Sequence, residues 1–78
     1  MESRIVSDPR IFGGKPIIRG LRISVEMVLD LLSQGMSAQE IIAEYPVLER
    51  EDVSACLRYA KEIVACEETE IALLGTEP

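Results

Sequence analysis

The sequence predicts a mainly α fold, a trihelical helix-turn-helix domain preceded by a short N-terminal β arm or hairpin. Three observations predict it: two well-defined helix N-caps, apolar residues that recur every three or four positions in three successive segments, and a glycine-rich basic stretch ahead of them. We expect one domain, with the arm at residues 1–23, the three helices at residues 24–66 and a C-terminal tail at residues 67–78.

The first helix is expected near residues 24–34. Ser24 is a favourable N-cap, because its hydroxyl can accept a hydrogen bond from an amide of the first turn. Four residues give the helix one apolar face: Val25, Val28, Leu29 and Leu32. Gly35 is the expected C-terminal cap, since glycine adopts the left-handed conformation without strain.

The second helix is expected near residues 37–45, only two residues after that glycine. Ser37 and Glu40 form a capping box, in which each side chain satisfies an amide of the helix N-terminus. Its apolar residues keep the helical spacing: Ala38, Ile41, Ile42 and Tyr45. Pro46 is expected to end it.

The third helix is expected near residues 49–66, with a first turn rich in acids, which suits the positive end of the helix dipole. Its predicted buried stripe is Val53, Cys56, Leu57, Ala60, Ile63 and Val64. The core that the three helices share is predicted to be Val28, Leu29, Leu32, Ile41, Ile42, Val53, Leu57 and Ala60.

A basic strip is predicted on the third helix. At about 100° per residue, its three cations and one serine fall on one side: Arg50, Ser54, Arg58 and Lys61. Such a strip is what a DNA-recognition helix carries, although Glu51 and Glu62 border it and would repel phosphates. An ordinary solvated helix face, with pairs four residues apart, explains the same pattern.

The arm supplies further cations and a small amount of β structure. A strand is expected at Arg4-Ile5-Val6, before a turn at Asp8-Pro9. Ile17-Ile18 could pair with Leu21-Arg22-Ile23, or either of these could pair with the first strand, and the register stays open. The arm cations that we expect at the DNA backbone are Lys15, Arg19 and Arg22.

The tail combines acids with large apolar residues. Ile71, Leu73 and Leu74 follow the acidic run Glu67-Glu68-Thr69-Glu70 and have little core left to join. We expect this segment to fold onto a protein partner. In the alternative, the last helix simply continues and packs back on its own domain.

The charge is divided unevenly along the chain. Residues 1–23 hold five cations and two acids, a net +3, whereas the remainder holds three cations and twelve acids, for −6 overall. A net acidic protein has a low non-specific affinity for nucleic acid, because non-specific affinity comes from neutralising phosphates. Any DNA contact must therefore come from local basic patches.

Composition argues against a metal site and against catalysis. The 78 residues include no histidine and two cysteines. Cys56 and Cys66 would lie about 15 Å apart along one helix, too far for a disulfide bond. Gly13-Gly14-Lys15 lacks the spacing and the following serine or threonine of a phosphate-binding loop. We expect a binding protein, not an enzyme, with no cofactor.

Neither a membrane span nor a signal peptide is present in the sequence, so we expect a cytoplasmic protein without membrane contact. A chain this short buries only about 60% of its unfolded surface and gains from a partner. A homodimer is expected, because one trihelical domain with few cations gives weak recognition and a dimer doubles the contacts.

These residues together resemble the prokaryotic family DUF433. The pattern begins with Asp8-Pro9 and the block Gly13-Gly14-Lys15-Pro16-Ile17-Ile18-Arg19-Gly20, followed by Arg22-Ile23-Ser24-Val25. It continues through Gly35-Met36-Ser37, Glu40-Ile41 and Tyr45-Pro46 to Glu51-Asp52-Val53 and Leu57-Tyr59-Ala60. The chain departs from the family at Leu21, where members often have threonine, and at Glu49, where they have a threonine or serine cap.

The resemblance implies a homeodomain-like trihelical fold and the role of an antitoxin in a type II toxin–antitoxin pair. On that reading the arm and helices bind operator DNA, and the C-terminal segment blocks a PIN-like ribonuclease toxin. The alternative is a protein-interaction module that keeps the helix-turn-helix shape and does not bind DNA. The salt dependence of DNA binding separates the two, because a DNA binder must lose affinity as salt rises.

Overall fold

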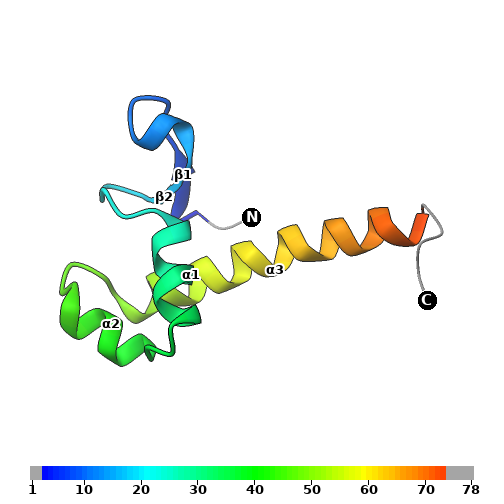
Figure 1. Ribbon diagram of the computed structural model, residues 1–78. Helices are drawn as coiled ribbons and strands as arrows, with labels where there is room; N and C mark the ends of the chain where they lie inside the picture. Colours follow the sequence, from blue (N-terminus) through cyan, green and yellow to red (C-terminus); the bar gives the residue numbers. More distant parts are fainter. Residues whose placement is uncertain (1–2, 74–78) are drawn as a thin grey trace.

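Three helices follow a two-stranded antiparallel hairpin in the computed structural model, which describes residues 3–73 and the side chains of residues 3–66 (Figure 1). The elements in chain order are β1 (Ile5–Ser7), the 3-10 turn η1 (Phe12–Gly14), β2 (Pro16–Ile18), α1 (Val25–Ser33), α2 (Ala38–Glu44) and α3 (Arg50–Leu73). This confirms the mainly α, trihelical fold with an N-terminal hairpin.

The helix caps form as the sequence predicts. The Ser24 hydroxyl accepts a hydrogen bond from the Met27 amide at 3.0 Å at the start of α1. At α2 the Ser37 hydroxyl accepts from the Glu40 amide at 3.1 Å. The Glu40 carboxylate accepts in return from the Ser37 amide at 2.8 Å. Gly35 between the helices has a φ of +96°, where a side chain would be strained.

The hairpin resolves the pairing that the sequence left open. β1 pairs with β2 in antiparallel register, with Ile5 opposite Ile18 and Val6 opposite Ile17. The segment before α1 also contacts β2, through a hydrogen bond of 3.0 Å from the Ile18 amide to the Ile23 carbonyl. Both pairings are therefore used, although only the first forms a ladder.

The start of α3 is anchored to the hairpin by a buried acid. The Asp52 carboxylate accepts a hydrogen bond from the Glu49 amide at 2.8 Å, so it supplies the cap that the Glu49 side chain cannot. Its second oxygen accepts from the Arg4 guanidinium at 2.8 Å, and Glu49 accepts from the same group at 2.9 Å. Arg4 thus ties β1 to the first turn of α3.

The core lies where β2, α1, α2 and the first half of α3 meet. Its buried residues are Ile18, Ile23, Val25, Val28, Ile41, Leu48, Val53 and Cys56. Of the predicted core, Val28, Ile41 and Val53 are buried, whereas Leu29, Leu32, Ile42 and Ala60 are half-buried. The prediction was wrong for Leu57, which is 50% exposed.

The error at Leu57 has a geometric cause. The buried face of α3 is centred on Asp52, Cys56 and the half-buried Tyr59, about 60° around the helix from the predicted stripe. The apolar pattern alone could not show that an acid would occupy the core side. Val64, also predicted to be buried, is exposed for the same reason. Ile63 lies on the core side of α3 and is 45% exposed because it lies beyond most of the core.

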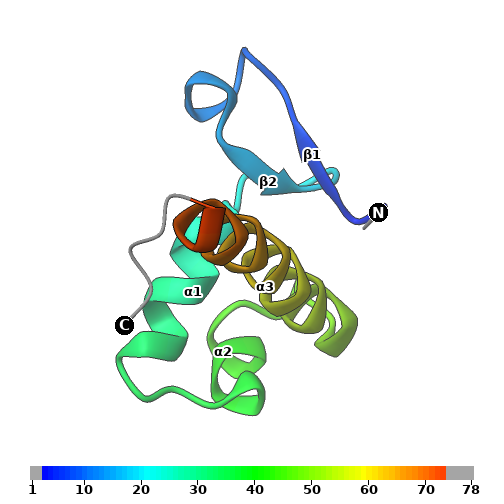
Figure 2. The ribbon, with the colours of Figure 1, turned by 90° about the vertical axis from the view of Figure 1, so that its right-hand side faces the viewer.

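α3 is longer than predicted and leaves the domain. Its 24 residues span about 36 Å, and its C-terminal half extends away from the other elements (Figure 1). Figure 2, which looks towards its C-terminal end, places the hairpin on one side of α3 and α1 with α2 on the other. The helix was expected to end near residue 66 and continues to Leu73, because no glycine or proline interrupts it before Gly75. The alternative was that the last helix continues and packs back on its own domain, and its first part, the continuation of the helix, is correct.

Candidate functional site

The predicted basic strip lies on one side of α3. Arg50, Ser54, Arg58 and Lys61 all fall within the helix, at successive spacings of four, four and three residues. The three cations are exposed and Ser54 is half-buried. Because the buried face of α3 is turned from its predicted position, the strip lies opposite the core and not beside it. The strip therefore points directly away from the domain.

Acids accompany the strip, as the sequence indicated. Glu51 and Glu62 are both exposed on α3. They lie to one side of the strip, so an approaching polyanion meets three cations and two nearby carboxylates. The surface offers local attraction for phosphate, not a broad positive field.

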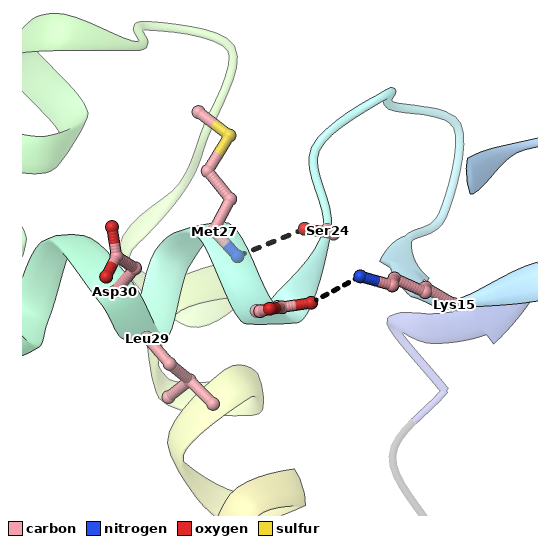
Figure 3. A pocket seen from close by; sticks show the side chains of 6 residues that line it. Lys15, Ser24, Met27, Leu29 and Asp30 are labelled. Carbon is pink, nitrogen blue, oxygen red and sulfur yellow. Dashed lines mark hydrogen bonds and ion pairs between the residues drawn. The ribbon is translucent and has the colours of Figure 1, made fainter.

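Lys15 of the arm is engaged with an acid of α1. Its ammonium lies 2.9 Å from the Glu26 carboxylate (Figure 3). The pair borders an open hollow of about 610 Å³ that Ser24, Met27, Leu29 and Asp30 also line. The hydrogen bond from Lys15 lowers the pKa of Glu26 below its ordinary value. Both side chains are exposed, so Lys15 can exchange this partner for a phosphate at little cost.

Arg19 and Arg22 lie elsewhere on the arm. Arg19 is exposed and borders a hollow of about 280 Å³ together with Arg4 and Asp52, on the core side of α3. Arg22 is exposed, and Asp8, whose pKa is lowered mainly by its hydrogen bonds with Arg10, also feels the charge of Arg22. The structure thus places the three predicted arm cations at separate sites and does not join them to the strip.

An apolar surface that the sequence analysis missed lies where α3 leaves the domain. Leu57, Ile63 and Val64 are 50%, 45% and 50% exposed. Ile63 and Val64 border an apolar groove of about 300 Å³ between β2, α1 and α3, which is completed by Pro16, Val25, Glu26, Leu29, Tyr59 and Ala60. The signal was present in the sequence, because these residues were assigned to a core stripe that extends further along the helix than the core itself.

The predicted partner-binding residues lie at the far end of α3. Ile71 and Leu73 fall within the backbone of the helix, whereas Leu74 lies outside the described residues. Their side chains lie outside the described residues, so the structure gives no contact for them. What the structure adds is that the segment leading to them is helical.

The described residues form neither a disulfide bond nor a metal-binding cluster. Cys56 is buried and Cys66 is exposed, and the two do not form a disulfide bond. Within residues 3–66, no three histidine, cysteine, aspartate or glutamate side chains are grouped so that they could hold a metal ion. No helix in the part of the chain that the structure describes has the length and apolar character needed to cross a bilayer.

A small trihelical domain with an N-terminal hairpin defines the class of this protein, and comparison with known proteins gives the family. The chain belongs to the DUF433 family, described as proteins of unknown function, whose model matches residues 5–60. A crystal structure of a DUF433 member from Anabaena variabilis superposes with a TM-score of 0.75 at 34% sequence identity, covering 91% of this chain and 70% of that one.

A further relative is the uncharacterized protein y4eO of Sinorhizobium fredii. It is 32% identical over 57 residues, which make up 73% of this chain and 26% of that protein. The chain therefore spans about a quarter of the length of this relative.

Proposed function

We propose that this chain acts by binding, without catalysis, as the cytoplasmic antitoxin of a type II pair. Its partner would be a PIN-like ribonuclease toxin, and the contact would be made by the projecting half of α3. The observation that carries the proposal is that α3 continues beyond the domain with Ile63 and Val64 exposed. An exposed apolar helix face attached to a folded domain is typical of an element that lies in the groove of another protein.

The charge of this region suits such a partner. Residues 24–78 carry a net −9, and the sequence from Glu62 to Glu70 contains four acids and no cation. A ribonuclease must bind an anionic substrate, so the rim of its active site is basic. An acidic helix with an apolar face can occupy that site and exclude RNA, with Ile71, Leu73 and Leu74 as the apolar contacts.

Operator binding is the second part of the proposal. It is supported by the α2–turn–α3 arrangement, with α3 in the place of a recognition helix and the strip pointing outwards. Arg50, Ser54, Arg58 and Lys61 would contact the groove or its phosphates, and Lys15, Arg19 and Arg22 are assigned to the backbone. The separate positions of these arm cations mean that they would contact different phosphates.

The experiment for the toxin is a truncation. Removing residues 67–78 should leave the domain folded, because the core residues all precede residue 60. It should weaken binding to the purified PIN-like protein encoded beside the gene by at least about a hundredfold, since each buried large aliphatic residue contributes about 1.5–3 kcal/mol. Calorimetry of both forms measures this. Equal affinities would place the neutralising surface on the arm or the domain.

The alternative is a protein-interaction module that does not bind DNA, and the net charge of −6 together with Glu51 and Glu62 favours it. A salt series decides between the two. Binding to the DNA upstream of the gene should weaken steeply as salt rises if the strip neutralises phosphates. Binding that is absent at low salt would leave toxin binding as the whole function.

A further inference from the structure

The outward apolar residues of α3 form a line along the helix. Leu57 and Val64 are each half exposed and lie seven residues apart, so they share one side of the helix. The sequence has Ile71 at the next position of the same spacing. Every described side chain from Lys61 to Cys66 is exposed, so the described domain leaves this part of the helix largely uncovered.

The charges of α3 are segregated along its length. Its cations, Arg50, Arg58 and Lys61, all precede residue 62 and outnumber the two acids there, Glu51 and the buried Asp52, by one. The acids Glu62, Glu67, Glu68 and Glu70 follow without a cation. Two such helices in parallel would place like charges together. In antiparallel orientation the basic half of each would lie along the acidic half of the other, which makes the helix complementary to a second copy of itself.

We propose that a second copy of this chain covers this face, with the two α3 helices packed antiparallel and Val64 at the two-fold axis. In this register, position 57 lies opposite position 71 of the copy, and position 61 lies beside position 68, on the same side of the seam. The sequence then pairs Leu57 with an isoleucine position and Lys61 with a glutamate position. Val64, at the centre of this register, also borders the apolar groove.

The occupant is a second copy because the match is reciprocal. A two-fold interface uses the same patch on both chains, so an apolar centre with opposite charges on its two flanks satisfies it without a further partner. In the free protein, the copy covers residues that the toxin would cover in the complex. The dimer itself does not rest on the proposed function, and its test contains neither toxin nor DNA.

One consequence does rest on operator binding. Ser54 lies ten residues before Val64, so the two Ser54 positions would lie about 30 Å apart along the paired helices. The strip is roughly a quarter turn around α3 from the Leu57–Val64 line. A two-fold axis between antiparallel helices turns both strips to the same side. Their separation is close to one turn of B-DNA, about 34 Å.

The first test is the oligomeric state by sedimentation equilibrium. The unaltered chain should be a dimer, and Val64→Glu should raise the dimer dissociation constant by at least about tenfold, because it places an unpaired carboxylate at the apolar centre. The matched control is Val47→Glu, the same change at a residue that is 62% exposed in the connection before α3. It should leave the dimer intact. A monomeric parent protein, or equal effects of the two variants, would overturn the proposal.

Orientation is tested by cross-linking in a Cys66→Ser background, since Cys56 is buried. Val64→Cys should form a disulfide-linked dimer on mild oxidation. Leu57→Cys should not, because the two copies of position 57 would be about 21 Å apart along the axis. Cross-linking at both positions would indicate parallel helices and contradict the proposal, as would its failure at position 64.

Charge reversal gives an independent readout. Lys61→Glu should weaken the dimer, and adding Glu68→Lys should restore it, because the two positions lie side by side only in the antiparallel register. Circular dichroism of each variant shows whether the helices are kept. A double variant no tighter than Lys61→Glu alone would sink the assigned register.

Discussion

The two halves of α3 differ in what determines their structure. From Arg50 to Ala60 the helix is held by the core, with Val53 and Cys56 buried against α1 and α2 and Asp52 fixed by the hairpin. From Lys61 onwards its described side chains are exposed, and beyond the groove at Ile63 and Val64 the helix extends away from the other elements (Figure 1). One continuous helix thus stabilises the domain with its first half and offers a surface with its second.

The largest expected effect concerns the first half and its contacts. Ile41→Ala should lower the free energy of unfolding by about 2–5 kcal/mol, because Ile41 is fully buried and its removal leaves a cavity. Leu57→Ala should cost less than about 1 kcal/mol in the monomer, since half of the side chain already meets water. Denaturant unfolding of both variants in dilute solution measures the difference. Equal losses would show that Leu57 belongs to the core after all.

The sequence was sufficient for most of the fold. Serine caps, the capping box and the glycine after α1 are local signals, and each formed where it was predicted. Val28, Ile41 and Val53 are also buried as predicted, because their helical spacing places them on the faces that meet at the centre of the domain. Local rules succeed here because the residues that make each interaction are neighbours in the sequence.

Which face of α3 is buried could not be predicted in the same way. Leu57 and Val64 fit a buried stripe as well as Cys56 does, and the packing of α1, α2 and the hairpin around α3 decides between them. The hairpin is tied to α3 through Arg4 and Asp52, which are 48 residues apart, and no local pattern connects them. For the candidate site, helical spacing grouped the strip correctly, whereas the separation of Lys15, Arg19 and Arg22 required the folded arm.

A second prediction concerns the anchor between the hairpin and α3. Asp52→Ala should cost about 1–2 kcal/mol of unfolding free energy, because the Glu49 amide loses its acceptor at the helix N-terminus. Asp52→Asn keeps an acceptor oxygen and loses the charge that faces Arg4. Comparing their chemical denaturation separates the cap from the ion pair. If both substitutions were neutral, the hairpin would not be what orients the first half of α3.

A third prediction concerns the strip on the first half of α3. Under operator binding, Arg58→Ala should weaken binding by up to about tenfold and reduce the salt slope by about one if Arg58 contacts a phosphate. Arg10→Ala is the matched control, because Arg10 is an exposed cation outside the predicted site and is engaged with Asp8. Gel-shift titrations at several salt concentrations compare the two. Equal losses would indicate a general effect of charge, not a site.

The smallest expected effect lies away from α3, at the Lys15–Glu26 pair. Lys15 lowers the pKa of Glu26, so the pair stabilises the folded state above the ordinary pKa of the carboxyl. This contribution is lost as the pH falls through the lowered pKa, where Glu26 becomes protonated. In Lys15→Ala, the pKa of Glu26 should return towards its ordinary value, and the stability difference from the parent should vanish in acid. NMR titration of the Glu26 carboxyl follows both changes. A pKa that stays low without Lys15 would show that the N-terminus of α1, and not the arm, holds this charge.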